Sequence, residues 1–402
     1  MRNNYVLLRQ IEENLLNVKV KDYYRDDFFE IDWNNDVVGL FGERWVWKTT
    51  ILLQKRKQLD DNKSFYFSAD NTLVKSNWLF EFVFFCFRNF GIENFFIDEI
   101  FKYSNWKEEL KNIIDSLPQI KLVFSWSSSM ALYDWIIDLW RRVYDYKINT
   151  LSFREFLKLK YNINLEKISL EDLVKDHENI SVQYSTKIKE IYFDEYIKQW
   201  AYPFWLELSF NSFANRLLKT LDRIIWEDLS YIKNFQTQSL EKISKLLYFI
   251  ANTTPSELSI NHLSKKIWVD KNLVDNVLYI LNKIWTVNLI QKWTNISDKV
   301  RKEYKIFLWD TNKYFVYNIK TDIWILRECF FISEMKKINN IFISLPSAWD
   351  FKVEYNNQNY IFEIWWKNKK NKYPKNTFIV KDNILSSENS YTIPLWLFWF
   401  LK

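Results

Sequence analysis

The first residues that could do chemistry lie in the stretch Val38–Leu53, VGLFGERWVWKTTILL. Gly42, Lys48 and Thr49 match the pattern G-x-x-x-x-G-K-[ST], and Trp47 stands at its second glycine. In such a loop, backbone N–H groups and a helix N-terminus hold phosphate oxygens, the lysine reaches the β- and γ-phosphates, and the threonine hydroxyl holds Mg²⁺. Only residues without a Cβ let the backbone come that close. The stretch therefore predicts a phosphate-binding loop for ATP if position 47 is glycine.

The surroundings of the loop favour the same interpretation. The apolar run VVGLFG indicates a strand, and KTTILLQKRKQL has a helical pattern, so the loop would join a strand to a helix N-terminus. We expect the residues from the first glycine to the second threonine to contact the nucleotide: Gly42, Glu43, Arg44, Trp45, Val46, Trp47, Lys48, Thr49 and Thr50.

Tryptophan and glycine occur in unusual numbers. The chain has 21 Trp and 3 Gly in 402 residues, whereas soluble proteins average about 7% glycine. Several tryptophans, such as Trp126, Trp205 and Trp268, stand where turns usually need glycine. Some bacterial lineages read UGA as glycine, and translating their UGA codons as tryptophan would give this composition. We predict that most of the tryptophans are glycine in the native protein; the alternative is a truly tryptophan-rich chain. The expected true indoles are Trp33, Trp106 and Trp396.

A carboxylate pair follows in the buried-strand pattern NFFIDE, which ends in Asp98 and Glu99. Beside a phosphate-binding loop, we expect Asp98 to support Mg²⁺ and Glu99 to orient the attacking water. The alternative is that both residues only cap the next segment. The presence of the loop upstream favours the catalytic interpretation.

Two further segments could complete a nucleotide site. In KLVFSWSSSM, Ser127 would lie beside the γ-phosphate as a sensor, whereas Ser128 and Ser129 could equally be a helix N-cap. In DLWRRVYDYKI, Arg141 or Arg142 could supply charge to the transition state, in the same chain or across a subunit boundary. A surface salt bridge is the alternative for either arginine.

Length and composition set further bounds. A chain of 402 residues supports roughly two to four domains. No apolar run reaches membrane-span length, and the first residues lack a secretory segment, so we expect a cytoplasmic protein without membrane contact. Cys86 and Cys329 give neither a disulfide framework nor a zinc pattern, and two histidines all but exclude His-based metal or triad chemistry. The net charge of +6 permits nucleic-acid contact without demanding it.

The order of apolar runs predicts the fold. VVGLFG, SFYFSAD, NFFIDE and KLVFSW indicate strands that alternate with helices, so we expect an α/β fold with a parallel sheet covered on both faces. KYFVYNI, NIFISL, FKVEY, NYIFEI and NTFIV indicate a second group of strands. The predicted domains are a helical lead-in at 1–35, a P-loop core at 36–163, a helical lid at 164–235, a winged helix-turn-helix at 236–304 and a C-terminal α/β domain at 305–402.

Several motifs, in this order, make a specific resemblance. GLFGER(G)V(G)KTT, FIDEI…NWKEEL, VFS(G)SSS, DL(G)RRV and LSFREFL resemble a bacterial and archaeal family of AAA+-type ATPases that carry a C-terminal domain of unknown function. YIKQ(G)AYPF, RECFF, FEI(G)(G)KNK and IPLWLF extend the resemblance over nearly the whole chain. It implies an ATP-binding AAA+ core, and it does not say what the ATPase works on.

The segment after the lid resembles a winged helix. Leu258–Ile267, a turn at Trp268–Asp270 and the helix Lys271–Lys283 would form a helix-turn-helix, with TVNLIQK as the wing. The outward residues of the second helix are Lys271, Asn272, Asp275 and Asn276, a poor face for phosphates. A hinge or a platform for a protein partner is therefore an alternative to DNA binding.

The last domain resembles a restriction-endonuclease-like fold. Such folds bind Mg²⁺ with a Glu on a helix, an Asp on one strand and Glu-x-Lys on the next. The matching residues are Glu328, Asp350, Glu363 and Lys367, of which Asp350 and Glu363 form a weak second metal site. Lys367 follows Glu363 by four residues instead of two, about 7 Å too far along a strand. A degenerate fold used for binding is the alternative.

We therefore expect an ATP-binding, Mg²⁺-dependent ATPase that acts on DNA or a protein and could form an oligomer. Two alternatives remain: a nucleotide-regulated adaptor with little turnover, and an ATP-gated, Mg²⁺-dependent nuclease. With true tryptophans at 45 and 47, the chain should not bind ATP, because bulky rings block the phosphates and disfavour positive φ.

Overall fold

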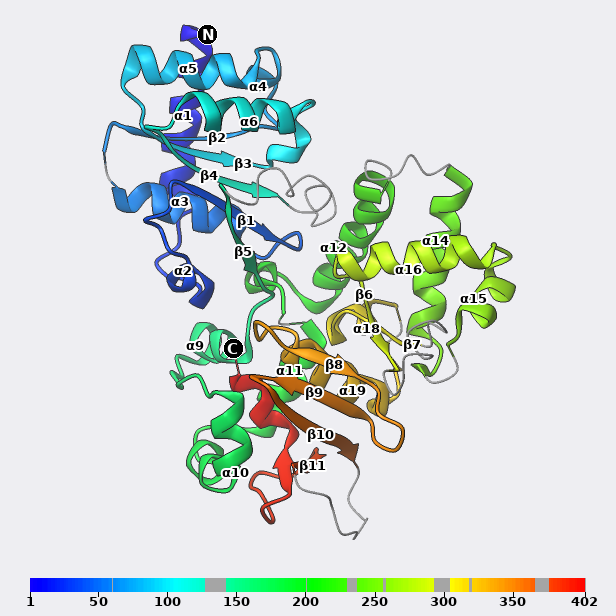
Figure 1. The fold of residues 1–402 in the computed structure, drawn as a ribbon. Helices are drawn as coiled ribbons and strands as arrows, with labels where there is room; N and C mark the ends of the chain where they lie inside the picture. The colour runs from blue at the N-terminus through cyan, green and yellow to red at the C-terminus, as the bar shows by residue number, and fades with distance from the viewer. Residues whose placement is uncertain are drawn as a thin grey trace. The chain divides into compact units, whose positions relative to one another are not determined.

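The computed structural model describes residues 1–59, 61–126, 142–199, 201–229, 237–255, 258–292, 304–317, 320–365 and 376–401. The chain divides into two compact units, Met1–Thr150 and Leu151–Lys402. Each unit is described by itself (Figure 1). The finer division into five domains stays a prediction.

The first unit contains a five-stranded sheet in the order β2-β3-β4-β1-β5, and all its neighbouring strands are parallel. Four of these strands coincide with the runs expected from sequence, and the fifth follows the arginine pair. Their bounds are β1 Val37–Gly42, β2 Ser64–Ser68, β3 Asn94–Asp98, β4 Lys121–Trp126 and β5 Tyr144–Ile148.

Helices cover both faces of this sheet, as the apolar strand pattern predicts. Alternate strand residues point to opposite faces, so Phe95 belongs to one apolar cluster and Phe96 to the other. The first cluster includes α5 (Leu79–Phe90) and α6 (Trp106–Ser116), and the second includes α3 (Lys48–Leu59). The unit begins with α1 (Arg2–Val18) and α2 (Asp26–Glu30), which occupy the expected helical lead-in.

The second unit begins with helices and continues into a helical module with a hairpin. The helices of its first part are α9 Phe153–Tyr161, α10 Leu170–Ser185, α11 Glu190–Gln199, η2 Pro203–Glu207, α12 Phe210–Arg223 and η3 Ile224–Leu229. The module that follows consists of α14 Thr237–Ala251, α15 Ile260–Ile267, α16 Lys271–Lys283, β6 Val287–Gln291 and β7 Tyr304–Leu308. β6 and β7 pair antiparallel. The helices and the hairpin occur in the order expected from sequence, and the interpretation as a winged helix stays a prediction.

The C-terminal part contains a mixed sheet in the order β12-β11-β10-β9-β8. β8, β9 and β10 are antiparallel neighbours, whereas β11 is parallel to β10 and to β12. The elements are α18 Thr311–Tyr317, α19 Ile323–Met335, β8 Phe342–Ser344, β9 Phe351–Tyr355, β10 Gln358–Trp365, β11 Thr377–Lys381, β12 Thr392–Pro394 and η5 Leu395–Phe400.

One expected strand of this part is wrong. KYFVYNI was predicted to be extended, but its described residues belong to the helix α18. The carboxylate of Asp310 accepts the N–H of Lys313 at 3.1 Å, which is an N-cap arrangement that starts a helix. The ammonium of Lys313 is buried and bonded to Asp310 and to the hydroxyl of Tyr202, both at 2.7 Å. These tertiary contacts outweigh the extended preference of the aromatic and β-branched residues.

Candidate functional site

The candidate nucleotide site lies where three neighbouring strands end. In the parallel register, Leu40 of β1 is opposite Ser125 of β4, and Ile97 of β3 is opposite Phe124. The carboxyl ends of β1, β3 and β4 therefore meet at one edge of the sheet. Open parallel sheets bind ligands at this edge.

The loop after β1 wraps around the side chain of Lys48. The ammonium of Lys48 donates to the carbonyl of Gly42 at 3.0 Å and to that of Glu43 at 2.7 Å. Burial lowers the pKa of Lys48, and the nearby carboxylates of Glu99 and Asp98 oppose that shift. The side chain of Lys48 is thus buried at the start of α3 and bonded to the backbone of the loop.

Gly42 itself is required by a close approach of two strands. A Cβ at Gly42 would lie 2.4 Å from the carbonyl oxygen of Ile148 on β5, which is closer than any real contact. The first glycine of the loop pattern is therefore fixed by packing as well as by its possible ligand.

The loop backbone adopts a glycine-like conformation at both tryptophans. Trp45 and Trp47 each have a φ of 70°, in the left-handed region that strains residues with a Cβ. Val46 lies between them and is buried. Residues of this kind turn successive N–H groups toward one side and make an anion-binding concavity. The backbone therefore fits a phosphate-binding loop better than the two indoles do.

A network of hydrogen bonds centres on Asp98. The hydroxyl of Thr49 donates to Oδ2 of Asp98 at 2.6 Å, and that of Tyr66 donates to the same oxygen at 3.0 Å. Oδ1 accepts the hydroxyl of Ser125 and the N–H of Glu99, the latter at 3.1 Å. The carboxylate is 4% exposed and fixed in direction by these donors. Thr49 and Asp98, expected to hold Mg²⁺, are thus brought together from two elements.

Tyr66 was not expected from sequence. It lies on β2 within SFYFS, where an aromatic residue is an ordinary strand choice. Burial and the neighbouring Asp98 raise the pKa of Tyr66 well above its usual value, so the phenol stays protonated and donates. The sequence signal that could have identified Tyr66 is a phenol at the centre of a buried strand, because a buried hydroxyl usually has a hydrogen-bond partner.

Glu99 lies at the end of β3 in a left-handed conformation. Its φ is 52°, and its N–H donates both to Asp98 and to the hydroxyl of Ser125, each at 3.1 Å. Non-glycine residues with such backbone angles are concentrated at functional sites. The charge of its carboxylate is the first of those that act to raise the pKa of Lys48 against the effect of burial.

The structure places Arg142 away from the loop. It pairs with Asp115 on the surface, just before β5. Tyr144, at the start of β5, is opposite Val38, whereas Ile148 is opposite Gly42. Four residues of strand separate these positions, about 13 Å. The structure thus has the surface salt bridge that was the alternative for Arg142, and a role for Arg142 at a nucleotide, including one across a subunit boundary, stays a prediction. Ser127 and Arg141 lie outside the described residues.

Other tryptophans, like those of the loop, have surroundings or backbone angles that suit glycine better than an indole. Trp268 and Trp285 have φ values of 54° and 57°. Trp126 is buried, its indole N–H has no hydrogen-bond partner among the residues that the structure describes, and its ring would lie 2.7 Å from a Cβ at Gly39. In contrast, the indole of Trp396 donates to a backbone carbonyl at 3.0 Å.

The other two residues expected to be true tryptophans are Trp33 and Trp106, and this expectation stays a prediction. Trp33 donates to the carbonyl of Phe28 at 3.1 Å. Trp106 is 3% exposed within the apolar cluster of the first unit. A buried indole usually finds such a partner or fills apolar space.

The charges of two C-terminal carboxylates, Asp350 and Glu363, act on the ionisation of Glu328 of α19. Burial raises the pKa of Glu328, Lys305 opposes the shift by pairing at 2.7 Å, and Asp350 and Glu363 add to it by repulsion. Oδ2 of Asp350 also accepts the N–H of Ile364 at 2.8 Å. In the part of the chain that the structure describes, no group of three or more Asp, Glu, His or Cys side chains is arranged to hold a metal ion. Lys367 lies outside that part.

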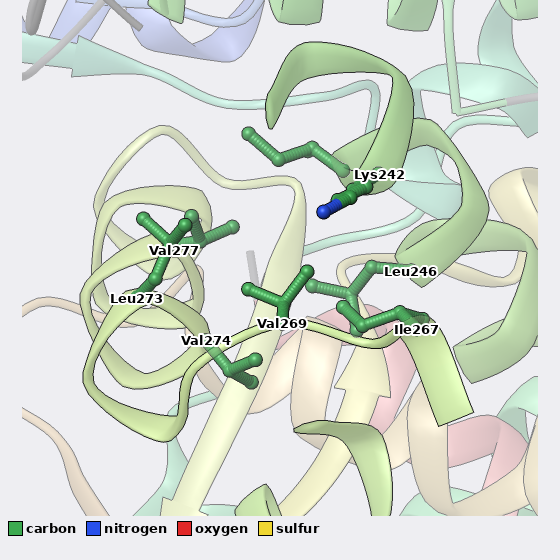
Figure 2. Close-up of a pocket in the computed structure, with 8 residues that line it drawn as sticks. Lys242, Leu246, Ile267, Val269, Leu273, Val274 and Val277 are labelled. Atoms are coloured by element: carbon green, nitrogen blue, oxygen red, sulfur yellow. The ribbon is translucent and has the colours of Figure 1, made fainter. Parts of the chain in front are cut away.

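The helical module contains a small apolar cavity of about 10 Å³ between α14, α15 and α16. Figure 2 shows Leu246, Val269, Leu273 and Val277 around it, with Lys242 at its border. Aliphatic walls of this kind offer no partner for a phosphate or a base edge.

No helix among the described residues is long and apolar enough to cross a membrane.

Comparisons with known proteins agree with the geometry of the loop. A family model described as an AAA domain matches residues 34–157, and one described as a domain of unknown function matches residues 204–312. The uncharacterised protein MJ1637 of Methanocaldococcus jannaschii is 28% identical over 330 residues, which cover 79% of this chain and 67% of that protein.

Solved structures give weaker likenesses. AMPPCP-bound DnaA from Aquifex aeolicus has a TM-score of 0.27 at 15% identity, covering 70% of this chain and 87% of the other. The Hsp104–ADP complex of S. cerevisiae has a TM-score of 0.29 at 12% identity, covering 68% of this chain and 41% of the other. At such scores the elements of the chains cannot be equated. The chain is thus similar to an AAA domain over residues 34–157 and to a domain of unknown function over residues 204–312.

Proposed function

We propose that this protein is an AAA+-type ATPase, which binds ATP with Mg²⁺ and hydrolyses it to drive or regulate a process directed at DNA or at another protein. The observation that carries the proposal is the meeting of three groups within an AAA domain: the buried ammonium of Lys48, the hydroxyl of Thr49 and the carboxylate of Asp98. These are the groups that hold a triphosphate and its cation in P-loop enzymes.

The proposal includes glycine at positions 45 and 47 of the native protein. Both residues have positive φ, and a Cβ there would strain a loop that must approach phosphates closely. We extend this proposal to Trp126, Trp268 and Trp285, on the grounds of their backbone angles or their unpartnered indole. The chain with glycine at these five positions is called the glycine form below.

The residues of the site divide the work of hydrolysis. Lys48 would donate to phosphate oxygens in place of the carbonyls that it now contacts. The oxygens of Thr49 and Asp98 suit Mg²⁺, which prefers hard oxygen ligands. When bound, Mg²⁺ supplies charge neutralisation at the phosphates. Glu99 would orient the attacking water and accept its proton.

ATP affinity and phosphate release in the glycine form test this proposal. In Lys48→Ala we expect ATP affinity to fall about tenfold to a hundredfold, because hydrogen bonds to charged groups are lost. In Glu99→Gln we expect ATP binding to persist, while turnover falls by about 10²- to 10⁴-fold. An unchanged affinity in Lys48→Ala would remove the assignment of the loop. Binding without turnover in the unmutated glycine form would favour the nucleotide-regulated adaptor.

We propose that α14 to β7 act as a winged helix that contacts the partner, either DNA or a protein. The support is the order of three helices and an antiparallel hairpin, with α15 and α16 joined at Trp268–Asp270. On the outer face of α16, Lys271 and Asn272 are exposed beside Asn276. ATPase assays with and without DNA separate the two partners, since a DNA-directed enzyme should change its rate with DNA.

An ATP-gated nuclease with a restriction-endonuclease-like C-terminal domain is the second candidate. Its support is that the charges of Asp350 and Glu363 act on Glu328, which is paired with Lys305 at 2.7 Å. Its test is Mg²⁺-dependent DNA cleavage that disappears in Glu363→Ala. If the glycine form cleaves no DNA with ATP and Mg²⁺ present, the domain serves binding only.

A further inference from the structure

Arg25 is a buried arginine whose contacts join two separate segments of the first unit. Nη1 donates to the carbonyl of Val46 at 2.9 Å and to that of Asn149 at 3.0 Å. Nη2 donates to the carbonyl of Thr150 at 3.2 Å and to the carboxylate of Asp27 at 3.1 Å. The residue is 1% exposed. A buried guanidinium is tolerated only where its donors are satisfied, so these acceptors fix its place.

The contact with Val46 sets the direction of one peptide in the phosphate-binding loop. A trans peptide is planar, and its C=O and N–H groups point in opposite directions. Because Arg25 holds the carbonyl of Val46, the N–H of position 47 points away from Arg25. Positions 45 and 47 have the positive φ that permits this orientation. Arg25 thereby orients an N–H group of the loop without reaching the ligand itself.

The other contacts of Arg25 bind the segment that leads out of the unit. The last strand, β5, ends at Ile148, and the unit ends at Thr150. Asp27, the carboxylate partner of Arg25, also accepts the N–H of Asn149 at 3.1 Å. One buried ion pair therefore holds both the loop and the end of the chain segment that continues into the second unit. We call Asn149–Thr150 the connector.

The chain is fixed again directly after the connector. The carbonyl of Leu151, the first residue of the second unit, accepts the ammonium of Lys337 at 3.2 Å and the hydroxyl of Tyr196 at 2.5 Å. Its N–H donates to the carbonyl of Ala201 at 2.8 Å. A change in the conformation of the connector would therefore act on a residue whose backbone is held by three hydrogen bonds.

We propose that Arg25 is a positioning residue, which orients the peptide between positions 46 and 47 for phosphate binding and links that orientation to the connector. The proposal rests on the proposed ATP site and names its coupling element. Binding energy at the loop and the conformation of the connector would then depend on each other, since coupling between two sites is reciprocal.

The test compares Arg25→Met with Arg56→Met in the glycine form. Arg56 is the matched control, because it is also buried in the first unit and pairs with the buried carboxylate of Glu12 at 2.7 Å. We expect Arg25→Met to weaken Mg·ATP binding about tenfold or more, the equivalent of one hydrogen bond to a charged group. Arg56→Met should stay within about twofold of the parent, within ordinary error on such energies.

Hydrogen exchange of peptides covering residues 42–50 and 146–152 gives the second readout. Without nucleotide, Arg25→Met should speed exchange in both peptides together, and Arg56→Met in neither. With ATP, the glycine form should slow exchange at 146–152, and Arg25→Met should lose that effect. If Arg25→Met does not fold, Arg25→Lys replaces it as the test. Lysine keeps the charge but lacks the planar guanidinium that donates to several acceptors at once, so it should show the same pattern in weaker form.

The outcomes separate this proposal from that of the ATP site. If the glycine form binds no ATP, the proposed function fails, and the nucleotide-free exchange still decides whether Arg25 holds the loop and the connector together. If ATP binds but the Arg25 and Arg56 variants have equal affinities and equal exchange at 146–152, Arg25 is only a structural residue and the proposal is overturned.

Discussion

The substitution Trp268→Gly should stabilise the chain that has tryptophan at all 21 positions. Trp268 is the C-terminal cap of α15, with φ 54° and ψ 52°, and its N–H donates to the carbonyl of Ser264. Its side chain is 87% exposed, so little packing is lost when the indole is removed. Glycine is the residue that most commonly occupies this left-handed position after a helix.

The size of the effect follows from two opposing terms. Relief of the left-handed strain contributes about 1–2 kcal/mol, and the greater freedom of glycine in the unfolded chain costs about 0.5–1 kcal/mol. We therefore expect Trp268→Gly to raise the free energy of unfolding by up to about 1.5 kcal/mol. Trp268→Ala keeps a Cβ and should give no such gain, which makes it the matched control.

Urea unfolding followed by far-ultraviolet circular dichroism would measure both variants in the otherwise unchanged chain. The reasoning predicts that glycine is more stable than alanine at position 268. If alanine equals or exceeds glycine there, positive φ at the tryptophans is no sign of native glycine, and the argument for positions 45 and 47 loses its main support.

The remaining predictions concern single residues. Trp106→Gly should lower the free energy of unfolding by about 3–5 kcal/mol in the same urea assay, because Trp106 fills the core. Thr49→Val in the glycine form should abolish the difference in ATP affinity between Mg²⁺ and EDTA buffers. Since burial lowers the pKa of Lys48 and a bound triphosphate would raise it, ATP affinity should fall as pH rises through the lowered pKa, with proton uptake visible by calorimetry in two buffers. Glu363→Ala should leave the ATPase rate unchanged.

Much of the first unit could be predicted because its signals are local. Four of the five strands of the central sheet are short apolar runs, and the loop and Asp98 lie at the ends of two of them. The helix α5 was not predicted: LFEFVFFCFRNF is nearly all apolar, although the residues that it buries, Leu79, Phe82, Val83 and Cys86, recur at helical spacing. Continuous apolar runs do not separate helix from strand.

The missed residues depend on contacts between distant segments. Arg25 and the connector are separated by more than a hundred positions, so no spacing rule joins them. Tyr66 acts through Asp98 on a neighbouring strand. The helix α18 depends on a buried lysine bonded to Tyr202. Sequence patterns report periodicity and local caps, whereas buried polar networks are set by the tertiary fold.

The central claim depends on the residues at positions 45 and 47. Peptide mass spectrometry of the protein purified from the organism that encodes it, covering residues 39–60, would identify them directly. We predict glycine at both positions, which leaves a complete phosphate-binding loop above Lys48 and Thr49. Tryptophan at both would contradict the account, because the protein would then keep the fold of an AAA domain without a usable nucleotide site.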